Sequence, residues 1–192
     1  MELTTSLIYG SVRTERKGIK AARYLEQKLL ERGHKIHFID PAKYKLPLLD
    51  KMFKEFTPGQ APEIMEKVAH MLQGSDAFLV VTGEYNHSIP PALKNLLDHF
   101  QREYFFKPAG IVSYSGGSFG GVRAAVHLRA VLGELGMISI SSMLPFPAVA
   151  SAFDEELKPV NPRTENSTRR FLDEFEWYAI ALKKQRIEGV PY

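Results

Sequence analysis

The sequence lacks cysteine altogether and has no long hydrophobic run. Without thiols the chain can form neither a disulfide nor a thiolate metal centre, and this composition is typical of a cytoplasmic protein. No segment approaches the roughly 18 consecutive apolar residues that a membrane-spanning helix requires. The first residues also lack the basic and apolar regions of a secretory signal peptide. We therefore expect a cytoplasmic protein with no membrane partner.

A strong excess of either charge is also absent. The 192 residues carry a formal net charge of +3, and lysine and arginine are scattered, except for Lys183, Lys184 and Arg186. This distribution does not favour nucleic-acid binding, and it suits a small anionic ligand better. With 44% hydrophobic and 24% charged residues, the chain is expected to fold as a single domain over residues 1–192.

Hydrophobic residues follow two spacings that alternate along the chain. Helical spacing occurs over residues 19–29, 64–72, 93–100, 128–135 and 172–182, and strand-like runs occur over residues 7–9, 36–39, 77–81, 111–114 and 138–140. This alternation predicts an α/β fold, in which a five-stranded parallel sheet has helices on both faces.

The composition of the strands predicts their order. Residues 77–81 are apolar throughout, as expected for a central strand, whereas residues 34–38 and 138–141 alternate between polar and apolar, as edge strands often do. Strands two and five at the edges correspond to the order 2-1-3-4-5 of flavodoxin-like folds. In that order the ligand binds beyond the carboxyl ends of the strands, so we expect the function in the loops after strands one, three and four.

The loop after the first strand has the composition of a phosphate site. Residues 10–14 read Gly-Ser-Val-Arg-Thr and lead into a helix from about Gly18. Free N–H groups and the positive dipole end of a helix favour an anion. Ser11 and Thr14 offer hydroxyl donors, and Arg13 offers a planar charged fork. This loop predicts a phosphorylated ligand.

The loop after the third strand, residues 83–91, contains an aromatic and an amide side chain, Tyr85 and Asn86. Such a pair could line a planar heterocycle whose polar edge bonds to backbone groups. Ser88 is expected to cap the helix that follows. We interpret His87 as a solvent-facing loop residue rather than a proton donor.

The loop after the fourth strand has four glycines within residues 115–121, so its backbone can approach a ligand closely. Residues 116–120 also match the G-x-S-x-G pattern of a hydrolase nucleophile elbow. The triad of that class needs an acid and then a histidine later in the chain, but the last histidine is His127. We therefore reject the hydrolase interpretation.

Several motifs in these loops occur in one recognisable order. They are Gly10-Ser11-x-Arg13, Glu84-Tyr85-Asn86-x-Ser88-x-Pro90, Leu93-Lys94-Asn95, Ser115-x-Gly117 and Gly120-Gly121-x-Arg123. Together they resemble the NADPH-dependent FMN reductase family, which includes flavin, quinone, chromate and azo-dye reductases. The resemblance extends from the first strand through Leu135 and implies bound FMN, with NADPH or NADH as electron donor.

The resemblance also implies which residues bind the cofactor. Those around the FMN phosphate would be Ser11, Arg13, Thr14, Arg16 and Gly18. Those at the isoalloxazine ring would be Glu84, Tyr85 and Asn86 on one side and Ser115, Gly116 and Gly117 on the other. The chain departs from many family members by carrying Arg16 where they have serine, and Gly83 where they have proline. The phosphate would then be held more by charge than by hydroxyl groups.

By the same resemblance, NADPH or NADH would deliver hydride to FMN and leave, and a small electron acceptor would then take its place, giving ping-pong kinetics. Quinone, flavin, azo, chromate and ferric acceptors all suit this chemistry, and no side-chain acid or base is required. The alternative is a non-enzymatic flavodoxin-like electron carrier or flavin-binding sensor. Such carriers are usually strongly acidic, which a net charge of +3 does not match.

Two further classes of site lack support. The sequence has no G-x-G-x-x-G fingerprint of a dinucleotide-binding dehydrogenase. His34 and His37 lie three residues apart on a strand and therefore point to opposite faces, so we expect no metal site.

The last third of the chain bears on subunit contacts. Residues 144–166 are expected to form a long loop before a helix over residues 164–186. This loop is either a surface connection or an arm that covers the ligand crevice or reaches a neighbouring subunit. Its apolar contacts would be Phe146, Val149 and Phe153. The apolar residues Leu96, Leu97, Phe100 and 104–106 are more than one sheet face needs, so they either form an exposed surface that favours self-association or pack in the core. The family resemblance implies a homodimer or homotetramer.

Overall fold

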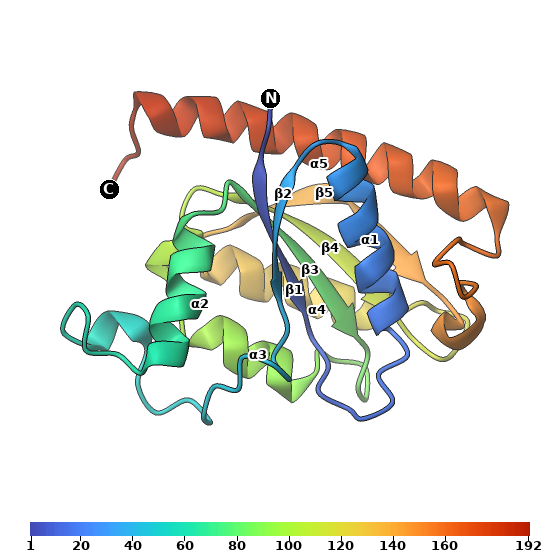
Figure 1. Cartoon of the computed structure of the whole chain (residues 1–192), viewed down its shortest axis with the longest axis horizontal. Coiled ribbons are helices and arrows are strands. Elements are labelled where there is room, and N and C mark those ends of the chain that lie inside the picture. Colours follow the sequence, from blue (N-terminus) through green and yellow to red (C-terminus); the bar gives the residue numbers. More distant parts are fainter.

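The chain folds around a five-stranded parallel sheet, seen in the computed structural model of residues 1–192 (Figure 1). The strands are β1 (Thr4–Tyr9), β2 (Lys35–Ile39), β3 (Ala77–Gly83), β4 (Pro108–Tyr114) and β5 (Ile138–Phe146). They lie in the order β2-β1-β3-β4-β5, and each neighbouring pair is parallel. The predicted α/β class and the flavodoxin-like order 2-1-3-4-5 are therefore confirmed.

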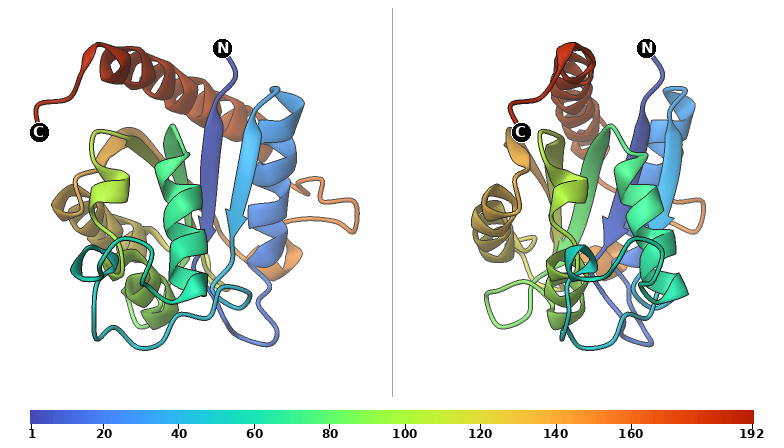
Figure 2. Two further views of the ribbon diagram at one scale, coloured as in Figure 1. Left: turned by 60° about the vertical axis from the view of Figure 1, so that its left-hand side comes forward. Right: turned by 90° about the vertical axis from the view of Figure 1, so that its left-hand side faces the viewer.

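Five helices cover both faces of the sheet (Figure 2). Helices α1 (Ile19–Glu31) and α5 (Pro162–Glu188) pack on one face, and α2 (Glu63–Gln73), α3 (Pro91–Asp98) and α4 (Val122–Glu134) pack on the other. Three 3-10 helices lie in connections: η1 (Phe53–Glu55), η2 (Arg102–Tyr104) and η3 (Val149–Ser151). Each face has its own apolar core because strands send alternate side chains to opposite faces. No helix is both long enough and apolar enough to cross a bilayer.

Burial along the strands follows their order. Every residue of β3 and β4 is buried, whereas β2 and β5 are only partly buried. Side chains form hydrogen bonds with backbone groups of β5, the strand at one edge of the sheet. Arg129 of α4 donates to the carbonyl groups of Ile140 (2.7 Å) and Ser141 (3.1 Å), and Glu174 of α5 accepts from the N–H groups of Ser141 (3.0 Å) and Ser142 (3.2 Å). These bonds occupy backbone groups that an open edge would offer to another strand.

Two boundaries differ from the sequence prediction. Strand β5 continues to Phe146 and α5 begins at Pro162, so the connection covers residues 147–161 rather than 144–166. A shift in register opposite Ala109 and Ile111 interrupts the alternation of β5, which hides the second half of the strand in the sequence. The predicted helix over residues 164–186 lies within α5, which Asn161 caps by accepting a backbone bond.

The apolar residues of the predicted loop are buried within the chain itself. Phe146, Val149 and Phe153 belong to the core between the sheet, α1 and α5. The ring of Tyr24 in α1 packs against those of Phe146 and Phe153, with centroids 6.3 and 5.2 Å apart. These three side chains are therefore not available to a neighbouring subunit.

The apolar run around α3 is buried as well. Leu96, Leu97, Phe100 and Tyr104 belong to the core on the face of α2, α3 and α4. Tyr104 packs edge-on against Phe78 of β3, with ring centroids 5.3 Å apart. Leu96, Leu97, Phe100 and Tyr104 therefore belong to the core rather than to an exposed surface for self-association, whereas Phe105 and Phe106 are only partly buried.

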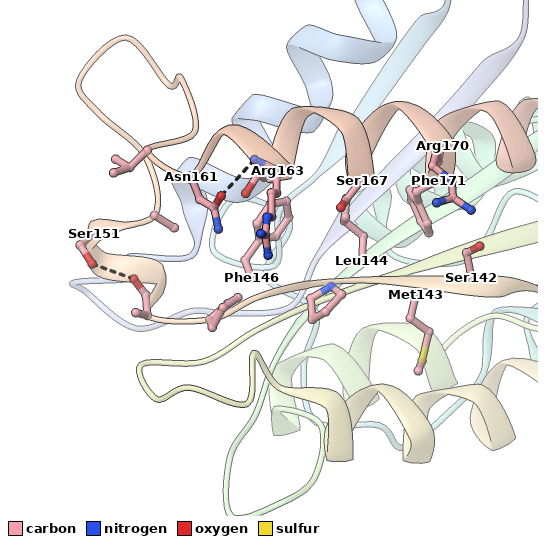
Figure 3. Close-up of a pocket in the computed structure, with 16 residues that line it drawn as sticks. Ser142, Met143, Leu144, Phe146, Ser151, Asn161, Arg163, Ser167, Arg170 and Phe171 are labelled. Carbon is pink, nitrogen blue, oxygen red and sulfur yellow. Dashed lines mark hydrogen bonds between the residues drawn. The ribbon is translucent and has the colours of Figure 1, made fainter.

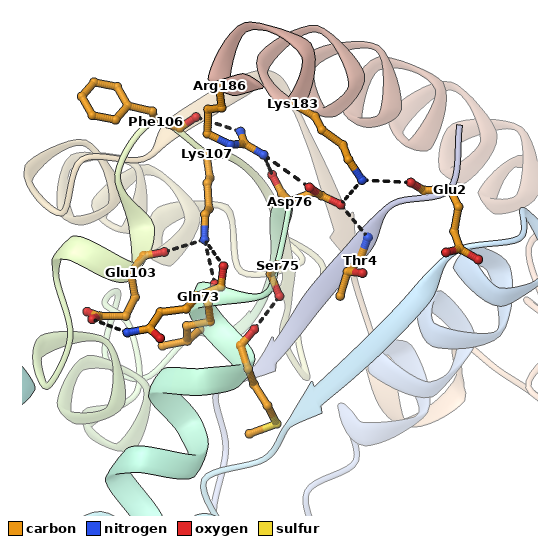
Figure 4. A network of polar contacts seen from close by, with 12 residues as sticks. Glu2, Thr4, Gln73, Ser75, Asp76, Glu103, Phe106, Lys107, Lys183 and Arg186 are labelled. Atoms are coloured by element: carbon orange, nitrogen blue, oxygen red, sulfur yellow. Dashed lines mark hydrogen bonds and ion pairs between the residues drawn. The ribbon is translucent and has the colours of Figure 1, made fainter. Parts of the chain in front are cut away.

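A buried lysine joins the elements at the amino edge of the sheet (Figure 4). The Nζ atom of Lys107 donates to the carbonyl groups of Leu72 (2.8 Å), Gln73 (3.0 Å) and Glu103 (3.0 Å). Two of these carbonyls end α2, where the helix itself provides no donor. The ammonium group therefore ties α2, η2 and β4 together.

Asp76 lies beside this lysine and connects the sheet to the end of α5 (Figure 4). Its carboxylate accepts from the N–H group of Thr4 (2.9 Å) and pairs with Lys183 (2.8 Å) and Arg186 (3.5 Å) of α5. Lys183 and Arg186, part of the basic group noted in the sequence, thus hold the C-terminal helix against the fold.

Candidate functional site

The loops after β1, β3, β4 and β5 meet at the carboxyl edge of the sheet and enclose a pocket of about 380 Å³. The predicted residues that line it are Ser11, Arg13, Arg16, Gly18, Glu84, Tyr85, Ser115 and Gly116; Thr14, Asn86 and Gly117 lie outside the lining. The lining also includes Glu15, Lys17, Gly83, Tyr114 and Ala150, which the sequence analysis did not assign to the site, and Val149, which it named as a contact of an arm over the crevice. The fold therefore brings the three predicted loops to one place and adds a fourth.

The two arginines of the first loop have different surroundings. Arg16 pairs with Asp40 at 2.6 Å and also donates to the carbonyl group of Ser11 at 3.3 Å. The hydrogen bond to Asp40 raises the pKa of Arg16 above its usual value. Arg13 is exposed, and its guanidinium has no partner in the protein. Arg16 thus shapes the loop, and Arg13 is the cation that remains free to meet an anion.

Three hydroxyl groups, of Ser11, Tyr85 and Tyr114, line the pocket, and a fourth, of Tyr9, is buried next to Tyr114. The Oγ atom of Ser11 lies 3.2 Å from the hydroxyl of Tyr85, and the hydroxyl of Tyr114 donates to that of Tyr9 at 3.2 Å. The rings of Tyr9 and Tyr114 are stacked with centroids 6.2 Å apart. Burial raises the pKa of both phenols, so they remain protonated donors.

Glycine residues leave room for the ring of Tyr114 and for a ligand. A Cβ atom on Gly18 would lie 2.2 Å from the ring of Tyr114, and one on Gly83 would lie 3.1 Å from it. A Cβ atom on Gly116 or Gly117 would meet no atom within 4 Å. Gly18 and Gly83 therefore make room for the ring of Tyr114, and Gly116 and Gly117 leave an open stretch of backbone beside the pocket.

The loop after β3 is a tight turn. Tyr85 and Ser88 exchange backbone hydrogen bonds of 2.9 and 3.0 Å, and the two residues between them, Asn86 and His87, have positive φ angles of 49° and 68°. Asparagine accepts this left-handed conformation more readily than most residues. Both residues lie at the exposed tip, as predicted for His87. Ser88 does not cap α3, contrary to the prediction, because the turn orients it elsewhere.

Glu84 links this turn to the start of α4. Its carboxylate accepts from the N–H groups of Arg123 (3.2 Å) and Ala124 (3.4 Å) and pairs with the Arg123 guanidinium (3.1 Å). Burial alone would raise the pKa of Glu84, but these bonds outweigh it and hold the pKa below its usual 4.5. A carboxylate also suits the positive end of the helix dipole. The side chain of Glu84 therefore holds two loops of the site in place.

Replacing Glu84 by glutamine is expected to lower the free energy of unfolding by about 1–2 kcal/mol at neutral pH, because a charged acceptor is lost. The lowered pKa means that the carboxylate stabilises the fold above pH 4.5 and loses this effect as the pH falls further. The difference between wild type and variant in urea denaturation should therefore shrink in acid. Glu134→Gln, at an exposed carboxylate without a partner on α4, is the control. Equal stability of all three proteins at neutral pH would contradict the role of Glu84.

The sequence matches the NADPH-dependent FMN reductase family over residues 4–150. The chain belongs to this family. The matched residues begin in β1 and end in η3, so they include every residue that lines the pocket. The chain is thus an oxidoreductase of the NAD(P)H-dependent FMN and quinone reductase type.

Individual relatives agree with this membership. A quinone reductase of Pseudomonas putida is 29% identical over 185 residues, which cover 90% of this chain and 92% of the relative. An NAD(P)H-dependent FMN reductase of Pseudomonas aeruginosa is 39% identical over 133 residues, 67% of this chain and 69% of the relative. The solved structure of FerB, a flavoenzyme NAD(P)H:(acceptor) oxidoreductase from Paracoccus denitrificans, has a TM-score of 0.76 and 25% identity, covering 95% of this chain and 98% of FerB.

The family implies FMN as cofactor and NAD(P)H as donor, and the pocket can be tested against that implication. FMN combines a phosphate, a hydroxylated chain and a planar ring. The pocket offers an arginine without a partner at Arg13, the hydroxyl of Ser11 and an open backbone at Gly116. The residues present therefore fit a cofactor of this chemistry.

Proposed function

We propose that this FMN reductase family member passes hydride from NAD(P)H through bound FMN to a quinone by a ping-pong mechanism. The observation that best supports this is the pocket at the carboxyl edge, where a free arginine, a hydroxyl cluster and an open glycine backbone meet. Quinone is the proposed acceptor because two quinone reductases from Pseudomonas putida match 90% of the chain. When bound, FMN supplies the redox chemistry, and the protein binds and orients it.

The loop after β1 is assigned to the phosphate end of FMN. Arg13 supplies the charge and Ser11 a hydroxyl donor, both from the pocket lining, and the N–H groups at the start of α1, next to Gly18, add further donors. Thr14, in the same loop but outside the lining, is proposed as a second hydroxyl donor. Arg16 holds this loop through Asp40, so its charge acts on the phosphate from a distance.

The loops after β3 and β4 are assigned to the two sides of the ring. The residues concerned are Glu84, Tyr85 and Asn86 on one side and Ser115, Gly116 and Gly117 on the other. Backbone N–H groups there would stabilise negative charge on the polar edge of the ring. Asn86, at the exposed tip of its turn, is also in a position to contact the acceptor. No side chain is assigned as a general acid or base.

An absorption spectrum tests the proposal. The purified protein, supplied with FMN and then freed of excess, should show the two visible flavin bands. Anaerobic NADPH or NADH should bleach them, and a quinone should restore them. Bound flavin that neither nucleotide reduces would favour the electron carrier or sensor, and a protein that retains no flavin would overturn the cofactor assignment. Flavin, azo, chromate and ferric acceptors can be tested in the same way, and the rate at which each restores the flavin bands compares it with quinone.

Replacing Arg13 by alanine should raise the dissociation constant for FMN by about 10- to 100-fold, since one charged hydrogen bond to phosphate is worth about 1.5–3 kcal/mol. Quenching of FMN fluorescence on binding measures this constant. Glu15→Gln is the matched control, because Glu15 is exposed and lines the same pocket with the opposite charge. This control should bind FMN at least as tightly as wild type. Unchanged affinity in Arg13→Ala would remove Arg13 from the phosphate site.

We further propose that the protein is a homodimer or homotetramer joined beside the pocket. Phe119 and Val126, in and after the loop following β4, are 61% and 59% exposed. Exposed apolar groups of this kind favour association. Light scattering should give a mass above the 21.7 kDa of one chain, and Val126→Asp should lower it. Leu48→Asp, at an exposed residue elsewhere, should leave it unchanged. A monomeric wild-type protein would contradict this proposal.

A further inference from the structure

A second pocket, larger than the first, lies between β5 and the first half of α5 (Figure 3). Its volume is about 560 Å³. Its polar lining includes Arg163, Thr164, Ser167 and Arg170 from α5, which recur at helical spacing and so share one side of the helix. In Figure 3 the side chain of Arg163 extends from α5 toward β5. This pocket is lined by residues to which the proposed function gives no role.

The two charged residues that line this pocket, Arg163 and Arg170, are both positive. Neither guanidinium, of Arg163 or Arg170, has a hydrogen bond or ion pair in the protein, and no carboxylate lines the pocket. Among the acidic residues of the same helix, Glu165 pairs with Lys28 at 2.9 Å and Glu176 pairs with Arg32 at 3.0 Å. Glu174, four residues after Arg170, accepts from the N–H groups of Ser141 and Ser142 at the end of the pocket, so it too is engaged by other donors. Two exposed arginines without an ion-pair partner are suited to a phosphoryl group.

The remaining lining suits more than a bare anion. Phe146, Leu144 and Phe171 give an apolar floor, and the hydroxyl groups of Thr164 and Ser167 lie between the two arginines along α5. Ligand sites commonly combine an apolar wall with a few placed polar groups. A nucleoside that carries a phosphate has this combination of a flat ring, hydroxyl groups and charge.

One short segment separates this pocket from the proposed FMN pocket. Within residues 147–152, Val149 and Ala150 line the FMN pocket, and Ala148, Ser151 and Ala152 line the second pocket. The two pockets are therefore on opposite sides of one stretch of backbone at η3. An extended ligand with one end at the FMN pocket can place its other end in the second pocket by passing around this segment.

We propose that the second pocket binds the phosphorylated adenosine half of NADPH, with Arg163 and Arg170 contacting the 2′-phosphate. This inference rests on the proposed function, because it assigns the far end of the electron donor. The 2′-phosphate is the group that NADH lacks, so these two arginines make NADPH the preferred donor.

Binding of adenosine 2′,5′-bisphosphate, measured by calorimetry on the FMN-loaded protein, tests the assignment without turnover. The probe carries the 2′-phosphate but no nicotinamide, and bound FMN keeps it out of the first pocket. The double variant Arg163→Ala/Arg170→Ala should bind it at least 10-fold more weakly than wild type. Arg169→Ala is the matched control, because Arg169 is exposed on the same helix but does not line the pocket. It should bind like wild type.

Two further measurements distinguish a site for the 2′-phosphate of NADPH from a general phosphate site. Adenosine 5′-phosphate and inorganic phosphate should both bind more weakly than the bisphosphate; equal binding of inorganic phosphate would show a simple anion site and overturn the assignment. In flavin reduction the double variant should raise KM for NADPH by about 10-fold and KM for NADH by less, which follows if the charged contacts are to the 2′-phosphate. Equal changes for both donors, or unchanged bisphosphate binding, would overturn it. Absence of bound flavin would instead refute the proposed function. In a flavin-free protein the first pocket is also open to the bisphosphate, so only the difference in binding between wild type and the double variant would report on the second pocket.

Discussion

Replacing Gly121 by alanine is expected to lower the free energy of unfolding by about 3 kcal/mol and to weaken FMN binding as well. Gly121 precedes α4 with a φ angle of 78°, a left-handed conformation that is unfavourable for alanine. A Cβ atom there would also lie 2.6 Å from the carbonyl oxygen of Tyr114. The end of β4 and the start of α4 would have to move apart, because backbone atoms cannot yield as a flexible side chain can.

The same displacement should reach the cofactor pocket. Tyr114 and Ser115 line the pocket, and the N–H groups at the start of α4 hold Glu84. Urea denaturation and FMN fluorescence would measure the two effects separately. Gly133→Ala is the control on the same helix: the site is exposed, a Cβ atom would meet nothing within 4 Å, and stability should rise by up to about 1 kcal/mol. A Gly121→Ala protein as stable as wild type would show that α4 can start without glycine.

The sheet could be predicted from sequence because burial marks the strands directly. Residues 77–81 are apolar throughout and occupy a central strand, and the alternating run at 34–38 includes most of an edge strand. The end of β5 could not be predicted in the same way. Its register shifts beside Ala109, and Pro145 and Pro147 follow, so the sequence looks like a loop where the backbone still pairs with β4.

The loops of the site were predictable, but the partners within them were not. Arg13 and Arg16 look equivalent in the sequence, and only the folded chain places Asp40 beside one of them, 24 positions further on. Tyr9 and Tyr114 lie in apolar strands and therefore look like ordinary core residues. Their hydroxyl groups meet across 105 positions, a contact that no local pattern records.

Replacing Lys107 by methionine is expected to lower the free energy of unfolding by about 3 kcal/mol. Methionine keeps much of the apolar length of the lysine but leaves the carbonyl groups of Leu72, Gln73 and Glu103 without their shared donor. Each buried acceptor that loses its partner costs about 1–3 kcal/mol before any relaxation. We expect a total loss near the lower end of the sum for the three carbonyl groups, because water can enter and bond to some of them.

Lys183→Met is the matched control, because its ammonium group pairs with Asp76 at 2.8 Å but its side chain is 29% exposed. A partly exposed pair contributes about 1 kcal/mol or less, so this variant should unfold at nearly the urea concentration of wild type. Lys107 lies at the amino edge of the sheet and the FMN pocket at the carboxyl edge, so Lys107→Met should still bind FMN with wild-type affinity below its unfolding transition. A smaller loss of stability for Lys107→Met than for Lys183→Met would mean that water replaces the ammonium group fully. Weaker FMN binding by Lys107→Met would mean that the two edges of the sheet are coupled. Gly121→Ala, in contrast, is expected to change both stability and FMN affinity, because its contacts lie at the pocket itself.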